Sequence, residues 1–278
     1  MGPVTALRDL LSVLLLLGAL VLGAAWLPAV WFEQNVVDQE GFLAVTQPLA
    51  DDPAFRTTLT DSVVEQLLAD DAVPSWIQES LTPLAQDQAS KLAGTDAYAA
   101  MWDETMVQLH GALFTPGGAP VDVDLAPGID AILDGVETHL PITLPRPDSA
   151  SVTLFTVPDV PFLHHATVMD PWAQRLGPIA LGMALLALLI GGHRRALLLL
   201  AGIAAAAAGA LDCMLASRIE QVVPDAVDQA AFLGPLVQVF EGRFADQLPA
   251  QAVVLMGAGA LVAVAGLVLL GLRRRPVR

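Results

Sequence analysis

Residues 10–32, LLSVLLLLGALVLGAAWLPAVWF, form an apolar run without a single charged side chain. In a helix, about 20 residues at about 1.5 Å each reach about 30 Å, which is the thickness of the hydrocarbon core of a bilayer. Helices in the core of a soluble domain rarely keep so long an apolar run unbroken. The run therefore predicts a transmembrane helix, and with it the class of the whole fold.

Three further apolar runs follow, at residues 172–192, 196–217 and 250–272. The chain is 55% hydrophobic and has a mean hydropathy of +0.60, which is too apolar for an ordinary soluble protein of 278 residues. We therefore predict a mainly α-helical membrane protein with a four-helix transmembrane bundle. Lysine occurs only at Lys91 while arginine and alanine are abundant, a bias typical of GC-rich bacteria, so the expected location is a bacterial plasma membrane.

Arginine gathers on one side of the predicted bundle. Arg194 and Arg195 lie in the turn between the second and third spans, Arg8 precedes the first span, and residues 273–278 contain four arginines. Because positively charged short segments stay in the cytoplasm, both termini are predicted to be cytoplasmic. Residues 33–170 then lie outside the membrane, and by count they carry 22 acidic and three basic side chains.

Aromatic residues support this orientation, because they mark the outer ends of the first two spans as an interfacial belt would: Trp26, Trp31, Phe32 and Trp172. In chain order the predicted segments are 1–9 (cytoplasmic N-terminus), 10–32 (first span), 33–171 (acidic extracytoplasmic domain), 172–192 (second span), 193–195 (cytoplasmic turn), 196–217 (third span), 218–249 (extracytoplasmic helical loop), 250–272 (fourth span) and 273–278 (basic cytoplasmic tail). An alternative for the first run is a secretory signal peptide cleaved near Ala24 or Ala25, which would leave three spans.

The acidic domain shows mostly helical periodicity. Two apolar stripes, one introduced by Asp52 as an N-cap and one beginning near Pro74, predict its first two helices. A third helix follows Thr95, and its apolar face consists of Tyr98, Met101, Trp102, Thr105, Met106, Leu109 and Leu113. A fourth, shorter helix covers about 129–140.

Two segments of the same domain favour β-strands. Residues 121–125 alternate apolar and acidic side chains, and residues 151–157 are rich in β-branched residues. We expect the two strands to pair, with the fourth helix between them. In the 218–249 loop, two amphipathic stripes punctuated by Pro224 and Pro235 predict two short helices. Their acidic polar faces favour packing against the outer domain over lying on lipid headgroups.

Four short motifs stand out along the first half of the chain: Asp38-x-x-Gly41-Phe42, Pro48-Leu49-Ala50-Asp51-Asp52-Pro53-Ala54-Phe55-Arg56, Tyr98-x-x-Met101-Trp102-Asp103-x-Thr105-x-x-x-x-His110 and Val123-Asp124-Leu125-Ala126-Pro127. Together they resemble sequences of an uncharacterised family of actinobacterial multi-pass membrane proteins. The resemblance covers most of the chain and implies a first span, a mostly helical extracytoplasmic region and a hydrophobic C-terminal half ending in arginines. The family has no established activity, so the resemblance implies no mechanism. Gly41 stands where such proteins often carry a charge.

Metal binding has weak candidates. His164, His165 and Asp170 offer two imidazoles and a carboxylate just before the second span, but adjacent histidines on a regular element rarely reach one ion. Asp122 and Asp124 point to one side of a strand, where a solvated face is the favoured interpretation over calcium binding. His110 shares a helical face with Trp102 and is interpreted as a core residue. No metal or cofactor is predicted.

Asp212 interrupts the third span, and a carboxylate within a membrane is costly enough to suggest a function or a charged partner. It lies near the outer end of the span, where Arg218 or Arg175 could pair with it. Structural pairing is favoured over ion conduction, because a single acid makes no relay.

Small residues in the last two spans let helix backbones approach closely. They include Gly202, Gly209, Gly259 and Gly266. We expect these faces to pack the bundle, and they also offer a seam for a homo-oligomer.

Several classes of function lack support. The net charge of −16 argues against nucleic acid as a partner, since binding phosphates requires a basic surface. Cys213 is the single cysteine, so an intrachain disulfide and a cysteine-based zinc site are both excluded. No nucleophile elbow, zinc-protease helix, phosphate loop or dinucleotide fingerprint is present, which favours a non-enzymatic protein.

Three functional hypotheses remain at this point. The favoured one is a non-enzymatic protein of the bacterial envelope, whose extracytoplasmic domain binds a partner protein, an envelope component or a small ligand. The second is a channel, a transporter or an accessory subunit of one, which would use Asp212. The third is an enzyme acting on envelope lipids or cell wall. The lipid bilayer is a partner in all three.

Overall fold

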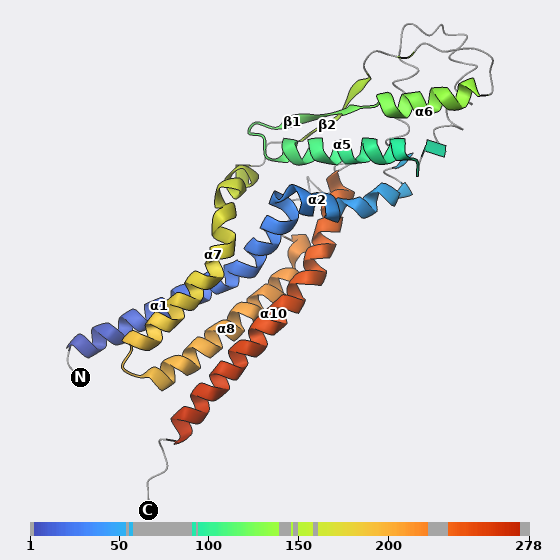
Figure 1. Ribbon diagram of the computed structural model, residues 1–278. Coiled ribbons are helices and arrows are strands. Elements are labelled where there is room, and N and C mark those ends of the chain that lie inside the picture. Colours follow the sequence, from blue (N-terminus) through green and yellow to red (C-terminus); the bar gives the residue numbers. More distant parts are fainter. Residues whose placement is uncertain are drawn as a thin grey trace, which may run out of the picture. The chain divides into compact units, whose positions relative to one another are not determined.

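The computed structural model describes residues 3–53, 56–57, 91–92, 94–138, 146, 150–157, 161–221 and 233–272. Over these residues the chain forms seven α-helices and one two-stranded antiparallel sheet, which confirms the predicted mainly helical fold with a small β element (Figure 1). It divides into two compact units, described separately below: unit 1 consists of Met1–Val37 and Val168–Arg278, and unit 2 of Asp38–Thr167.

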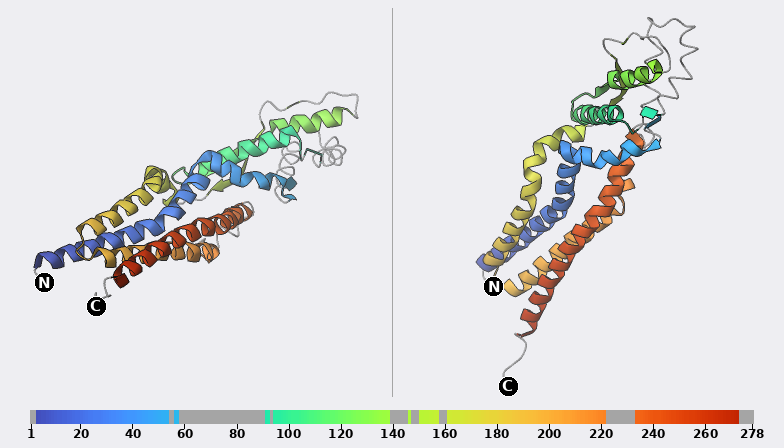
Figure 2. Two further views of the ribbon diagram at one scale, coloured as in Figure 1. Left: turned by 60° about the horizontal axis from the view of Figure 1, so that its bottom comes forward. Right: turned by 45° about the vertical axis from the view of Figure 1, so that its right-hand side comes forward.

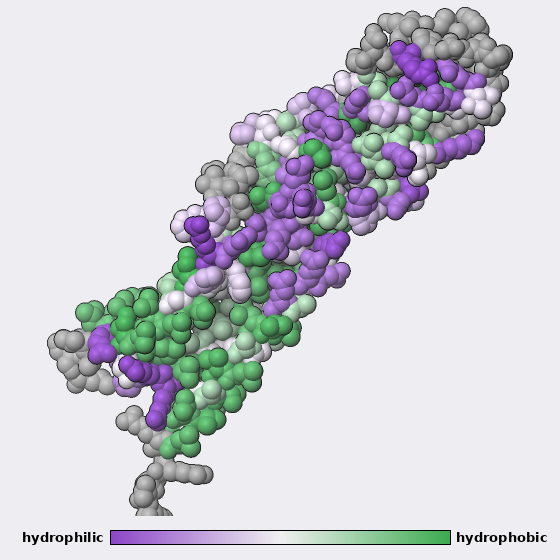
Figure 3. Space-filling model, viewed as in Figure 1, coloured by the Kyte–Doolittle hydropathy of each residue, from purple (hydrophilic) through white to green (hydrophobic). Residues whose placement is uncertain are grey.

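Unit 1 contains four helices that are long and apolar enough to cross a membrane, as predicted. They are α1 (Pro3–Phe32), α7 (Pro161–Ile190, whose first turns belong to unit 2), α8 (Arg194–Ala216) and α10 (Leu233–Gly271). Their outward surface is apolar: Val254 and Leu261 are 71% and 74% exposed. On the face seen in Figure 3, hydrophobic residues gather over these helices. An exposed apolar surface of this kind is typical of helices that contact lipid.

The four long helices alternate in direction along the chain, so that α8 packs antiparallel to α10 and parallel to α1 (Figures 1 and 2). The turn between α7 and α8 is tied to the beginning of α1. Arg8 donates from Nε and Nη2 to the carbonyl of Ile190 at 3.0 and 2.7 Å. Asp9 accepts from the amide of Gly192 at 3.2 Å and lies 3.3 Å from His193 Nδ1. These contacts fix three helix ends relative to one another.

Two helices of unit 1 begin earlier than the sequence predicts. α7 starts at Pro161 and continues through Pro171 and Pro178, whereas the second span was predicted to begin at Trp172. α10 is a single helix of 39 residues that includes Pro249, so the second predicted loop helix and the fourth span are one element. A proline removes one backbone donor and disturbs the preceding turn, which kinks a helix without ending it when neighbouring turns are held by packing. Residues 222–232, where the first loop helix was predicted, lie outside the described part of the chain.

Unit 2 is built around α5 (Asp96–Leu113), which begins at the predicted cap: Thr95 Oγ1 accepts from the amide of Tyr98 at 3.3 Å. Its buried face consists of Tyr98, Met101, Trp102, Thr105, Met106, Leu109 and Ala112, which confirms the predicted helix with Ala112 in place of Leu113. Before it come η1 (Glu33–Val37, in unit 1), α2 (Gln39–Thr46), capped by Asp38, and η2 (Gln47–Asp51). The first two helices predicted for this domain lie mostly or wholly outside the described residues.

The two predicted strands pair as expected, with a helix between them. β1 (Ala119–Asp124) and β2 (Ser151–Val157) are antiparallel, with an irregularity between Val121 and Asp122, and α6 (Ala126–Glu137) connects them. Val121 and Val123 are buried, whereas Asp122 and Asp124 are exposed, as alternation requires. The turn before β1 contains Gly117 and Gly118 at φ 87° and 79°, a conformation that favours glycine. α5 packs against β1 and α6, which closes the core of this unit.

Candidate functional site

The carboxylate of Asp212 is enclosed within unit 1. Asp212 is 1% exposed, and the residues one turn before and after it on α8, Ala208 and Ala216, are also buried. Its Oδ2 atom has no hydrogen-bond partner among the described residues. A buried carboxylate that lacks a partner is costly to keep, so this residue is the strongest polar anomaly of the bundle.

The arginines expected beside Asp212 lie elsewhere. Arg175 is stacked over the ring of Trp172, at 5.8 Å from its centroid. Arg218 follows the end of α8 and is exposed; it is about 240° further around the helix than Asp212, so it faces another direction. No ion pair links Asp212 to either arginine within the described part of the chain. The predicted pairing is therefore corrected.

An apolar cavity of about 460 Å³ lies among the four long helices. Along α8 it begins one turn before Asp212, toward the middle of that helix. Trp26, Gly177, Ala205, Ala208 and Leu255 line it, together with neighbouring aliphatic residues of α1, α7 and α8. Ala208 lies one turn before Asp212. The cavity has the size of a pocket for a small apolar molecule, and its lining offers no charged group.

On the other side of Asp212, an aromatic cluster closes the bundle. Trp31 and Phe244 meet edge to face with ring centroids 4.9 Å apart, and Trp31 Nε1 donates to Gln247 Oε1 at 2.9 Å. Leu248 and Ala216 pack in the same cluster. Trp31 is only 6% exposed, so it serves as a core residue where an interfacial belt was expected. The exposed Trp172 fits the belt better.

The four glycines expected at packing faces all lie on the seam between α8 and α10. A Cβ atom on Gly202 would come within 2.2 Å of the Ala263 nitrogen, and one on Gly259 within 2.4 Å of the Ala206 nitrogen. A Cβ atom on Gly209 or on Gly266 would likewise lie 2.5 Å from a backbone atom of the facing helix. Contact between backbones along the seam is possible only because these positions lack side chains.

The metal candidates before the second span lie where the structure describes the backbone alone. His164, His165 and Asp170 lie in the first turns of α7, where neighbouring residues are about 100° apart around the helix. The structure does not describe their side chains. Among the described residues, no group of three His, Cys, Asp or Glu side chains could hold a metal ion.

The other candidates, which belong to unit 2, have structural partners. Asp122 accepts from the Thr153 hydroxyl, and Asp124 accepts from the amide of Ala126 at 2.9 Å. His110 lies between the rings of Phe42 and Phe114, with centroids 5.1 and 5.0 Å away. These contacts agree with structural roles for all three.

Sequence reasoning missed one ionic cluster of unit 2. Arg146 pairs with Asp130 at 3.2 Å, with Glu137 at 3.6 Å and with Asp134, so one cation binds three acids of α6. The hydrogen bond that Arg146 donates to Asp134 is the main cause that raises the pKa of the Arg146 guanidinium. The spacing of Asp130, Asp134 and Glu137 on one helical face was the available signal, but nothing in the sequence placed Arg146 beside it.

Comparison of the chain with protein-family models, with curated proteins and with solved structures finds no match.

Proposed function

We propose that the chain is a non-enzymatic integral membrane protein of the bacterial cell envelope, whose unit 2 binds a partner outside the membrane. In this proposal both termini are cytoplasmic, unit 1 is the anchor, and the partner is a protein, another envelope component or a small ligand. One observation carries the proposal: unit 2 is a separately packed acidic unit, Asp38–Thr167, inserted between the first two candidate spans.

The core of unit 2 supports a role in presenting a surface. Trp102, Met106, Leu109 and Val121 are each at most 1% exposed, so the unit needs no lipid to bury its apolar residues. Because unit 2 packs a core of its own, its exposed surface supports a binding role.

The described surface of α5 favours a partner with basic groups. Asp96 and Asp103 are exposed and lie two turns apart on one face of the helix. Val107, one turn further, is 37% exposed and adds an apolar contact beside the two acids. A mixed acidic and apolar surface of this kind complements a basic partner that also carries aliphatic groups.

Photo-crosslinking tests the proposal in intact cells. A photoreactive amino acid at Asp103 or Val107 should form the same adduct, since the two positions are neighbours. Leu261, which is exposed on the surface of α10, is the control and should form no protein adduct. The double variant Asp96→Asn/Asp103→Asn should weaken the adduct formed from Val107. No adduct from any exposed position of α5, with a normal envelope in a deletion strain, would contradict the proposal.

Asp212 supports a second candidate function, a channel or transporter subunit. A buried carboxylate with an unpartnered oxygen beside an apolar cavity is a feature that a purely structural anchor does not need. The variant Asp212→Asn keeps the shape and removes the charge. If Asp212 serves transport, growth or ion flux should fall in this variant while its thermal stability stays equal or rises. Unchanged growth and flux would remove the support for this candidate.

A further inference from the structure

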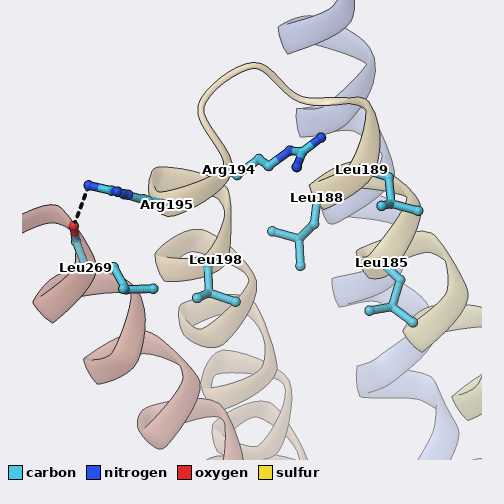
Figure 4. A pocket seen from close by; sticks show the side chains of 7 residues that line it. All are labelled: Leu185, Leu188, Leu189, Arg194, Arg195, Leu198 and Leu269. Atoms are coloured by element: carbon cyan, nitrogen blue, oxygen red, sulfur yellow. Dashed lines mark hydrogen bonds between the residues drawn. The ribbon is translucent and has the colours of Figure 1, made fainter.

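We propose that the cytoplasmic end of unit 1 holds one anionic phospholipid, with its headgroup at Arg194 and Arg195 and an acyl chain in the leucine pocket below them. The pocket has a volume of about 410 Å³ and lies between α7, the beginning of α8 and the end of α10 (Figure 4). It is lined by Leu185, Leu188, Leu189, Arg194, Arg195, Leu198 and Leu269. This proposal does not depend on the partner-binding function of unit 2.

The lining combines an apolar part with a charged part, as a site for a phospholipid requires. Its five leucines offer only aliphatic surface, and among the described residues the two arginines are the only polar side chains that line it. Leu185 and Leu189 are 52% and 65% exposed, so the pocket opens outward to whatever surrounds the spans. Leu185 lies five residues before the end of α7 at Ile190, which is about 7.5 Å along the helix at about 1.5 Å per residue, so the apolar part extends into the span while the charges stay at its end.

The charges at the pocket match an anion. Arg195 Nη1 donates to the carbonyl of Leu269 at 3.0 Å, which holds this guanidinium at the rim (Figure 4). Arg194 makes no ion pair or side-chain hydrogen bond within the described residues, so its guanidinium can bind a ligand. Asp9, an acid at the same end, is already bonded to Gly192 and His193.

The beginning of α8 adds a second contribution. Its N-cap residue is His193, whose side chain makes no capping hydrogen bond. The first amides of α8 belong to Arg194 and Arg195 themselves, and a phosphate group bound at this helix end would satisfy them. None of the described residues that line the pocket is an acid that could bind the ammonium group of a zwitterionic lipid. Basic pockets between spans are known lipid-headgroup sites, and the expected ligand is an anionic glycerophospholipid.

Lipid retention by the purified full-length protein tests the proposal. Delipidated protein in mild detergent is titrated with phosphatidylglycerol or with phosphatidylcholine of the same acyl chains, and bound lipid is counted by native mass spectrometry. We expect one phosphatidylglycerol to be retained in preference to phosphatidylcholine. Arg194→Gln should weaken its retention roughly fivefold, which corresponds to about 1 kcal/mol. Arg194→Lys should stay close to the wild type.

Two controls separate a seated lipid from general charge attraction. Arg218→Gln removes an exposed arginine at the opposite end of α8 and should leave retention unchanged. Leu198→Trp fills the pocket without touching either charge and should reduce retention. Equal retention of the two lipids, or equal loss in the variants at Arg194 and Arg218, would overturn the proposal. Displacement of the lipid by millimolar glycerol phosphate, with no effect of Leu198→Trp, would also overturn it, because the site would then bind free phosphate.

Discussion

Tyr98 is the single tyrosine of the chain, and burial has changed its acidity. It is 3% exposed, and its hydroxyl has no hydrogen-bond partner among the described residues. Desolvation raises the pKa of the phenol from 10.0 to about 12. Ultraviolet titration of the intact protein should therefore show one phenolate transition near pH 12, which returns to about 10 when the protein is unfolded in denaturant. A transition near 10 in the native protein would mean that Tyr98 is solvated.

The same shift predicts how stability depends on pH. Because the folded pKa of Tyr98 lies above the unfolded value, its contribution is fully present below about pH 10 and is lost as the pH rises toward 12. Tyr98→Phe should remove this part of the alkaline loss and leave the thermal midpoint at neutral pH similar or higher, since it deletes a buried unsatisfied hydroxyl. Thermal unfolding at pH 7 and pH 11 measures both effects.

At single residues, the sequence predicted which side chains are unusual but not which partners they contact. Asp212 stands out in an apolar run, so its importance was visible, but the directions of Arg218 and Arg175 depend on helix rotation and packing. The ion pairs of Arg146 join chain segments whose relative placement depends on the fold of unit 2. An aromatic residue at the end of a span has the same sequence signal whether it faces lipid or the bundle interior, so Trp31 is predicted at the lipid interface. Its hydrogen bond to Gln247, 216 residues away, depends on how the helices pack.

At the scale of elements, the seam between α8 and α10 gives a matched pair of variants on one helix. Gly259→Ala should lower stability by about 1–3 kcal/mol, because its Cβ would lie 2.4 Å from a backbone nitrogen of α8. A Cβ atom added at Gly257 would have no neighbouring atom within 4 Å. Gly257→Ala should therefore be neutral or stabilising, since alanine favours a helix by about 1 kcal/mol over glycine. Thermal unfolding in one detergent compares them. Equal midpoints would contradict the close approach of the two backbones.

The length of α10 is a second prediction at this scale. A continuous helix places positions 242 and 261 about 29 Å apart, at about 1.5 Å per residue. Spin labels on Gly242→Cys and Leu261→Cys, in a Cys213→Ala background, should give a narrow distance distribution at that value. A shorter, broad distribution would indicate the break near Pro249 that the sequence favours.

Apolar runs and alternation predicted the four long helices and the paired strands, because both patterns follow directly from which surfaces must be buried. Element ends were predicted less well. Pro171 and Pro249 favour element boundaries in the sequence, yet a helix continues through each. Proline removes one backbone donor and disturbs the preceding turn, which a helix can accommodate as a kink, so the residue type alone does not fix where a helix ends.

At the scale of the whole molecule, an uncleaved first span is testable by mass. Leu16 is buried with Ala187 and Leu197, and Gly18 lies against Met183, so α1 is part of the packing of unit 1. Cleavage near Ala24 would remove both contacts. We therefore expect the intact mass of the purified protein to include the residues before Ala24. A mass that begins near Ala25 would support the signal-peptide alternative.

The orientation of the chain is the premise for an extracytoplasmic unit 2, and it has its own test. Because the four helices alternate in direction, the beginning of α1, the turn between α7 and α8 and the end of α10 lie at one end of unit 1 (Figure 1). Arginines near these points predict that this end is cytoplasmic. Alkaline phosphatase inserted at Gly117, an exposed turn position that tolerates insertion, should be active, because the enzyme matures only outside the cytoplasm. The same fusion after Arg278 should be inactive, and a fluorescent protein there should be bright. The reversed pattern would place the acidic unit in the cytoplasm, and a binding role in the envelope would then have no physical basis.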